Sequence, residues 1–198
     1  MSTKPKITKD LLLEAGMRIL RKDGENALNA RNIAAELNCS TQPLLYHFGS
    51  VEAFKDALYQ QADAFHTAYL MESDAAAANP MLSIGLRYIR FGAEEGNLFR
   101  FLFQSDHLRG ADLRDLMQSP RLAPILQILQ READLTSKQA ADVFAALELA
   151  VHGYASFLAN NSMPYDPAYA AEMLSLIFYG TIGALKQQEG THHEETLG

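Results

Sequence analysis

One short segment, STQPLLYHFGS from position 40, brings together side chains that can bind nucleic acid. It carries the hydroxyls of Ser40 and Thr41, the amide of Gln42, the phenol of Tyr46 and the imidazole of His47. An amide can pair with the edge of adenine through two hydrogen bonds, and the other groups can donate hydrogen bonds to phosphate oxygens. These residue types predict a helix that contacts DNA.

The elements that position this segment are two short helices joined by a turn. Asn29 can cap the first helix, which is expected to end near Asn38, and Ser40 is expected to cap the second. Two such helices make a helix-turn-helix, whose second helix enters the major groove. On that helix Gln42 is the expected base reader, and Leu45 on the same face can press against a thymine methyl group.

Capping residues and apolar periodicity predict further helices along the chain and no strand. Thr8 and Gly24 bound the first helix, and Ser50 starts a long helix that runs to about Ser73. The later helices are expected to start at Asn79, Asn97, Ser119, Thr136 and Asp166, the last two ending near Asn160 and Gln188. The predicted fold class is all-α, with about nine helices and a frayed tail from residue 190.

The region from about residue 8 to residue 60 resembles the DNA-binding region of the tetracycline-repressor (TetR) family. The matching positions are Ile33, Ala34, Ser40, Leu44, His47, Phe48, Ser50, Glu52 and Ala53. Two positions depart from the family pattern. Val51 stands where a phosphate-contacting lysine is usual, and Leu45 where an aromatic residue is commonest, so one backbone contact and the choice of bases are open.

The resemblance implies an N-terminal three-helix helix-turn-helix domain over residues 1–52. A larger C-terminal helical domain for ligand binding and dimerisation would follow over residues 53–198. The resemblance adds Arg31 to the DNA-contacting residues and places Tyr46 and His47 toward the phosphates. The imidazole of His47 can equally pack under the fourth helix. Cys39 is expected to be a buried structural thiol, with a redox sensor as the alternative.

TetR-like proteins bind DNA as dimers that pair through their last two helices, and both helices are predicted here to be amphipathic. The residues expected at the dimer interface are Val151, Tyr154, Leu158, Ile177 and Thr181. Small residues beside them, including Gly153, Gly180 and Gly183, would allow close helix approach. The partner implied is a second copy of the chain.

The middle of the sequence is rich in aromatic residues, which in this family would surround a small-molecule pocket. The expected lining is Phe65, Tyr69, Tyr88, Phe91 and Phe103. The ligand implied is mostly apolar or aromatic, and a cation is possible over the ring faces. Ordinary core packing is the alternative. No cofactor or metal is expected, because the histidines at 66, 107 and 152 lack carboxylates at ligand spacing.

Composition places the protein in the cytoplasm. Its only cysteine is Cys39, so it has no intrachain disulfide, and neither a signal peptide nor about 18 uninterrupted apolar residues are found. The 198 residues carry a net charge of −7, whereas residues 1–60 alone have a balance of +1. The basic N-terminal arm is either part of a DNA contact or a solvated face.

Together these features predict a sequence-specific DNA-binding transcriptional regulator. The regulator is expected to be a repressor that a small-molecule ligand releases from operator DNA. An alternative is a helical small-molecule-binding or scaffold protein with weak or lost DNA affinity, motivated by Val51 and the negative net charge. An enzyme is not expected, because no nucleophile with its base, phosphate-cradling glycine loop or metal set has the required spacing.

Overall fold

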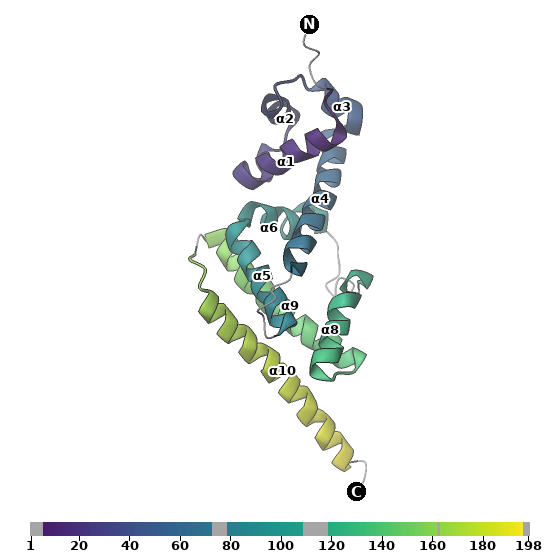
Figure 1. Cartoon of the computed structure of the whole chain (residues 1–198), viewed down its shortest axis with the longest axis vertical. Helices are drawn as coiled ribbons and strands as arrows, with labels where there is room; N and C mark the ends of the chain where they lie inside the picture. The colour runs from purple at the N-terminus through teal and green to yellow at the C-terminus, as the bar shows by residue number, and fades with distance from the viewer. Residues whose placement is uncertain (1–5, 73–78, 109–118, 162, 196–198) are drawn as a thin grey trace. The chain divides into compact units, whose positions relative to one another are not determined.

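The computed structural model describes residues 6–72, 79–108, 119–161 and 163–195 (Figure 1). Within these ranges the chain forms nine α-helices and three 3₁₀ helices, and no strand. The α-helices are α1 (Lys9–Asp23), α2 (Ala30–Glu36), α3 (Gln42–Phe48), α4 (Val51–Met71), α5 (Pro80–Glu94), α6 (Gly96–Phe103), α8 (Ala123–Ala133), α9 (Ser137–Asn161) and α10 (Pro167–Glu195). The 3₁₀ helices are η1 (Glu25–Ala27), η2 (Asp106–Leu108) and η3 (Pro120–Leu122). The all-α prediction is confirmed.

Most of the predicted helix starts are confirmed by hydrogen bonds of their capping side chains. The Thr8 hydroxyl accepts from the Leu11 amide at 3.2 Å, and the Asn29 side chain accepts from two amides at the start of α2. Thr136 and Gln139 form the expected reciprocal pair before α9. Asp166 caps α10 in the same way as Asn29 caps α2. These caps satisfy amides that have no partner within the helix.

Four helix boundaries differ from the prediction. The segment expected to start a helix at Ser119 forms η3 first, and α8 begins at Ala123. The cap residue of α3 is Thr41 rather than Ser40, and its side chain makes no capping hydrogen bond. Asn97 lies inside α6 instead of capping it, because its side chain bonds the Arg21 carbonyl oxygen at 2.9 Å. The backbone of α10 stays helical to Glu195, so the expected frayed tail from residue 190 is wrong as far as the described residues reach.

The chain packs into two compact units. Unit 1 comprises Met1–Tyr69 and Glu94–Arg109, and unit 2 comprises Leu70–Ala93 and Gly110–Gly198. The first unit therefore contains α1 to α3, nearly all of α4, and α6. These bounds describe packing, whereas the division between residues 52 and 53 is implied by the family resemblance, and that division stays a prediction.

The core of unit 1 forms where α1 crosses α4. Phe54 of α4 is fully buried, and its ring lies against Gly16 of α1, where a Cβ atom would come within 2.6 Å of the ring. Leu12 and Leu20 of α1 and Leu58 of α4 are buried beside it. Close approach of α1 to α4 thus depends on a glycine under a phenylalanine ring.

The core of unit 2 is built on α9, which α5, α8 and α10 contact. Its buried side chains recur at three and four spacing along α9, as expected for one stripe of an amphipathic helix. At Gly92 of α5 a Cβ atom would lie 2.7 Å from the Ala155 carbonyl oxygen of α9. The two helices are therefore in backbone contact at this point.

Helices α9 and α10 are long and apolar enough to cross a membrane by length and composition. Their most apolar windows, within Ser137–Asn161 and Pro167–Gln187, have a mean hydropathy of 1.2 and 1.3. Core helices of water-soluble proteins meet the same criterion, and α9 holds the core of unit 2. The expected absence of a membrane span stays a prediction.

Candidate nucleic-acid interface

Helices α2 and α3 are held by their apolar faces and joined by a tight turn. Ile33 of α2 and Leu44 of α3 are 0% and 1% exposed. Between the helices the Cys39 amide donates to the Ala34 carbonyl oxygen at 2.9 Å, and Asn38 has a φ of 49°. Asparagine is among the few residues that tolerate this left-handed conformation. The geometry is that of a helix-turn-helix.

The outer face of α3 carries two large exposed apolar side chains. Tyr46 is 81% exposed and Leu45 is 49% exposed, although both are of types that are usually covered. Gln42 on the same short helix is also exposed, as are Ser40 before it and Arg31 at the start of α2, while Thr41 is half-buried. All seven predicted DNA-contacting residues are therefore exposed or half-buried on α3, in the turn before it or at the start of α2, and of these His47 also has a contact within the protein.

His47 has a partner inside unit 1. Its Nε2 lies 3.1 Å from the carbonyl oxygen of Ile7, and its ring meets the edge of Tyr46 with centroids 5.1 Å apart. Because a carbonyl can only accept, Nε2 carries the proton in this contact. A neutral ring then offers only an acceptor at Nδ1, so a hydrogen bond to phosphate requires the protonated ring. The phosphate contact of His47 stays a prediction beside this structural role.

The helices under the candidate interface are tied to one another by ion pairs. Arg18 of α1 contacts Glu36 of α2 at 2.7 Å, and Lys55 of α4 contacts Glu25 at 3.1 Å.

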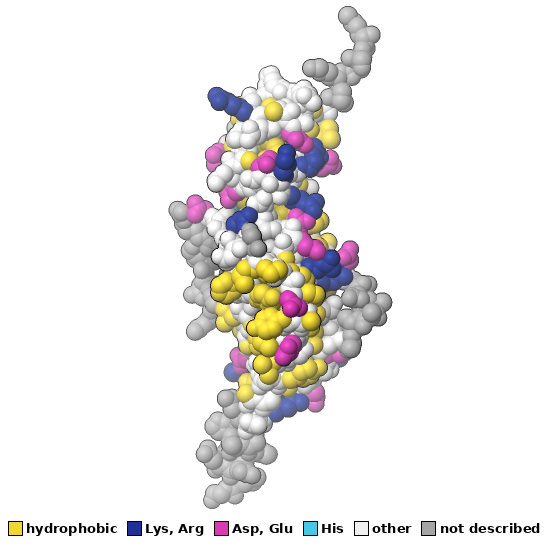
Figure 2. All heavy atoms as spheres, turned by 90° about the vertical axis from the view of Figure 1, so that its left-hand side faces the viewer, with side chains coloured by type: hydrophobic (Ala, Val, Ile, Leu, Met, Phe, Trp, Pro, Cys, Tyr) yellow, Lys and Arg dark blue, Asp and Glu magenta, His cyan; other side chains and the backbone are white. Residues whose placement is uncertain are grey.

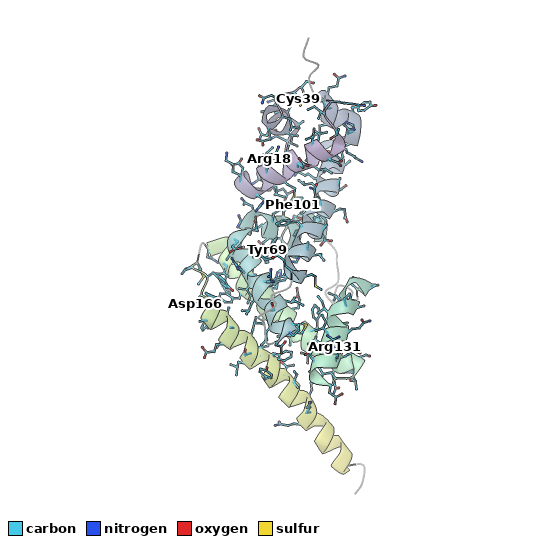
Figure 3. The ribbon with its side chains drawn as sticks, in the orientation of Figure 1. Arg18, Cys39, Tyr69, Phe101, Arg131 and Asp166 are labelled. Atoms are coloured by element: carbon cyan, nitrogen blue, oxygen red, sulfur yellow. The ribbon has the colours of Figure 1, made fainter. Side chains whose placement is uncertain are left out.

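Figure 3 labels Arg18 on α1 and Cys39 at the turn between α2 and α3. Cys39 is half-buried, and its Sγ donates to the Ser40 carbonyl oxygen at 3.2 Å. Val51, where a lysine is usual in the resembling family, is half-buried at the start of α4.

The five aromatic residues predicted to line a ligand pocket are divided between the two units. In unit 1, Phe65 lies near Tyr69, whose hydroxyl donates to Glu94 at 2.9 Å. Phe103, also in unit 1, packs on the ring of His66. In unit 2, Phe91 is fully buried and Tyr88 is 5% exposed. The shared pocket stays a prediction.

The stripe predicted for dimerisation is turned toward the core at two positions. Val151 and Leu158 of α9 are 3% and 4% exposed, because α9 packs this stripe into unit 2. Tyr154, half-buried, packs edge-on against Tyr169 of α10. On α10, Ile177 and Thr181 are half-buried. Helix α9 carries apolar residues on two sides, and periodicity alone does not rank them. The set of residues expected at the dimer interface stays a prediction.

The apolar residues that do face outward on α9 and α10 were not singled out from the sequence. They are Leu149, Phe157, Tyr169, Leu176 and Tyr179, each more than half exposed. Figure 2 shows apolar side chains gathered on this face of unit 2. Cβ atoms added at Gly153, Gly180 and Gly183 would meet nothing within 4 Å. The sequence signal that could have found this surface is the second apolar stripe beside those glycines.

The three histidines considered as metal ligands are divided between the two units. His66 and His107 belong to unit 1 and His152 to unit 2. Burial lowers the pKa of His66 to about 4, so its ring is neutral at physiological pH. Within the described residues no group of three or more His, Cys, Asp or Glu side chains could hold a metal ion.

Comparison with known proteins gives a likeness in fold among solved structures. No protein-family model matches the sequence, and no curated protein matches it significantly. Among solved structures, a TetR-like transcriptional regulator from Rhodococcus sp. RHA1 has a TM-score of 0.63 at 16% identity. The match covers 89% of this chain and 97% of that one. The fold of this chain is therefore similar to that of a TetR-like transcriptional regulator, as the helix-turn-helix residues predicted.

Proposed function

We propose that the protein is a sequence-specific DNA-binding transcriptional regulator that reads DNA with α3. The observation that carries the proposal is the exposure of Gln42, Leu45 and Tyr46 on a short helix anchored by the fully buried Leu44. A helix that packs one face into the protein core and exposes the other to solvent is suited to enter a major groove. The likeness in fold to a TetR-like regulator supports the same reading.

Each side chain around α3 has a distinct proposed role. Gln42 reads adenine through paired hydrogen bonds, and Leu45 contacts a thymine methyl group. Phosphates are contacted by the Tyr46 hydroxyl, by Ser40, Thr41 and Arg31, and by the protonated form of His47. Base contacts set the sequence preference, whereas phosphate contacts set the affinity for any DNA.

Selection of a binding sequence from random duplexes, followed by affinity measurements over a range of salt, tests the proposal. Gln42→Ala is expected to weaken binding by about 1–3 kcal/mol and to relax the preference at one base position. Gln60→Ala is the matched control, because Gln60 is an exposed glutamine on α4. Binding that does not weaken with salt, or no binding at all, would instead support the scaffold alternative.

Position 51 offers a second test of how the start of α4 lies relative to DNA. Val51 is half-buried where the resembling family carries a lysine. Val51→Lys should tighten binding to all sequences and steepen the salt dependence by about one phosphate contact. Unchanged affinity and salt dependence would place position 51 away from the DNA backbone.

We further propose that the protein acts as a dimer, paired through the outward apolar face of α9 and α10. Leu149, Phe157, Leu176 and Tyr179 lie on this face, and an exposed apolar surface of this kind marks an interaction site. The open space at the three glycines lets a partner helix approach closely. Repetition of α3 across a two-fold axis would make the operator a pseudo-palindrome.

A pair of matched substitutions separates dimerisation from DNA contact. Leu176→Glu should produce a monomer by sedimentation, whereas Leu45→Glu should leave the dimer intact and abolish DNA binding. Both leucines are exposed, at 65% and 49%, so neither change disturbs a core. A Leu176→Glu protein that remains dimeric would remove α10 from the interface.

Repression and release by a ligand complete the proposal, and they rest on the resemblance and on the aromatic content of both units. The expected effector is apolar or aromatic, and a cationic compound is possible through the ring faces. A thermal-shift screen of aromatic and cationic compounds, followed by a DNA-release assay, tests this. A compound that stabilises the protein without changing its DNA affinity would contradict release.

A further inference from the structure

The contact between α5 and α9 in unit 2 is unusually close for two helices. Gly85, Tyr88 and Gly92 fall on one face of α5, three and four residues apart. A Cβ atom at residue 85 would lie 3.0 Å from Leu174 and 3.5 Å from Val151, and one at residue 92 would meet the Ala155 backbone. Glycines on both sides of Tyr88 therefore bring α5 down onto α9, and the tyrosine side chain is pressed into the contact.

Tyr88 meets two titratable side chains from one face of α9. Its hydroxyl oxygen lies 3.0 Å from Nδ1 of His152, and it is also hydrogen-bonded to the carboxyl of Glu148. Glu148 and His152 are four residues apart, so they lie one above the other on the helix. The three residues form a polar cluster in a contact whose other members are apolar.

The hydroxyl of Tyr88 has one proton and two neighbours that compete for it. When Glu148 is protonated, the carboxyl can donate to the tyrosine oxygen, and the tyrosine can donate to Nδ1 of a neutral His152. When Glu148 is ionised, the tyrosine must donate to the carboxylate, and Nδ1 of His152 must then carry a proton to keep its contact. Loss of the Glu148 proton therefore reverses every hydrogen bond in the cluster.

Burial sets the protonation of all three groups. Glu148 is half-buried, and burial raises the pKa of its carboxyl to about 7. The hydrogen bond from Tyr88 opposes this rise. Burial also lowers the pKa of His152 and, together with Glu148, raises that of Tyr88 well above 10.

The charged residues of the neighbouring elements are either paired with other residues or exposed. On α5, Arg87 pairs with Glu72 at 2.8 Å, and Arg90 is exposed. On α8, Arg131 pairs with the adjacent Glu132, and at the start of α9 Lys138 pairs with Asp142. On α10, Glu172 is exposed. Burial and Tyr88 are thus what control the Glu148 proton among the described residues.

We propose that the Tyr88–Glu148–His152 cluster makes the packing of α5 against α9 depend on the protonation of the Glu148 carboxyl. The contact is tight while the carboxyl carries its proton, and it loosens when the carboxyl ionises. This places a pH-sensitive element inside unit 2 that operates around neutral pH. The proposal stands independently of DNA binding.

The sign of the effect follows from linkage. A carboxyl whose pKa is higher in the folded than in the unfolded protein stabilises the fold at low pH, and this stabilisation is lost as the pH rises. With values of 4.5 unfolded and about 7 folded, the Glu148 contribution to the folding constant falls by up to about tenfold between pH 6 and pH 8. His152, with a lowered pKa, acts in the opposite direction as the pH rises toward 6.5.

The test compares the pH dependence of unfolding in the full chain and three variants. Glu148→Gln keeps the size and the neutral state of the protonated carboxyl. In this variant the folding constant should no longer show the decrease between pH 6 and pH 8 that Glu148 contributes in the wild type. Asp142→Asn, an exposed carboxyl on the same helix, should keep the wild-type profile. Tyr88→Phe removes the hydrogen bond that lowers the Glu148 pKa, and should move the loss of stability to higher pH.

Two further measurements locate the effect. A carbon NMR titration of Glu148 should give a midpoint near neutrality. Hydrogen exchange should show α5 and α9 losing protection at alkaline pH in wild type but not in Glu148→Gln. A carboxyl that titrates near 4.5, or identical pH profiles for wild type and Glu148→Gln, would overturn the proposal. A loss of protection confined to other helices would also overturn it.

Discussion

The two units place their polar and apolar side chains in opposite ways. In unit 1 the ion pairs Arg18–Glu36 and Lys55–Glu25 join helices near the surface over an apolar core. In unit 2 the polar cluster around Tyr88 lies within a helix contact, while large apolar side chains such as Leu176 face outward. Large apolar side chains are thus exposed in unit 1 on α3 and in unit 2 along α9 and α10.

The largest effect is expected for truncation of the core of unit 1. Phe54→Ala removes a fully buried ring that packs on Gly16 and edge-on against Phe48, and should cost about 3–5 kcal/mol of stability. Chemical denaturation measures the cost, and hydrogen exchange should locate the loss of protection in α1 to α4. Equal loss of protection throughout unit 2 would break the comparison, because the units would then unfold together.

A smaller effect is expected from adding one methyl group to unit 2. Gly92→Ala places a Cβ against the Ala155 backbone, which cannot shift as a flexible side chain can. The substitution should lower the free energy of unfolding by about 1–3 kcal/mol. Gly153→Ala is the matched control on α9 when both changes are made in the Leu176→Glu variant, since its Cβ meets nothing within 4 Å in the single chain, and alanine favours a helix. Equal destabilisation of both variants would show that the α5–α9 contact can relax.

A loss of about 1 kcal/mol is expected from removing the cap of α2. Asn29→Ala leaves the Arg31 and Asn32 amides without their acceptor, and Asn26→Ala, an exposed asparagine in η1, is the control. Because α2 supports α3, DNA affinity should fall as the stability of α1 to α3 falls. Full affinity in a destabilised Asn29→Ala protein would show that α3 is positioned without α2.

The smallest effect is expected at the surface of unit 1. Arg18 and Glu36 have side chains that are 53% and 37% exposed, so solvent screens their attraction. A double-mutant cycle with Arg18→Met and Glu36→Gln should give a coupling below about 1 kcal/mol. A much larger coupling would mean that surface ion pairs, more than the Phe54 core, hold unit 1.

The same contrast explains what could be predicted from the sequence. Helices α1 and α2 of unit 1 are capped by Thr8 and Asn29, whose side chains bond amides two or three residues ahead, so the starts of these helices can be predicted without tertiary information. Helix α9 has apolar residues on two sides, and only packing decides that Val151 is inside and Leu149 outside. The Tyr88 cluster was missed because its partners lie 60 or more residues away in the sequence.

One boundary in unit 1 was missed for a related reason. Asn97 looks like a helix cap in the sequence, but its side chain is used by another part of the chain, the carboxyl end of α1. Arg21 of α1 also pairs with Glu95, immediately before α6. Long-range partners of this kind override a local capping signal, and no local pattern announces them.

The membership of α6 in unit 1 has a consequence for how the protein is made. Residues up to Tyr69 leave the ribosome first, and the next segment to emerge, Leu70–Ala93, belongs to the other unit. Only then does the chain deliver α6, which packs on α1 through Asn97. Unit 1 of the nascent chain is therefore complete only after α6 has been synthesised. A gene fragment that encodes residues 1–52 alone lacks α6, and with it the Asn97 side chain that bonds the Arg21 carbonyl oxygen near the end of α1.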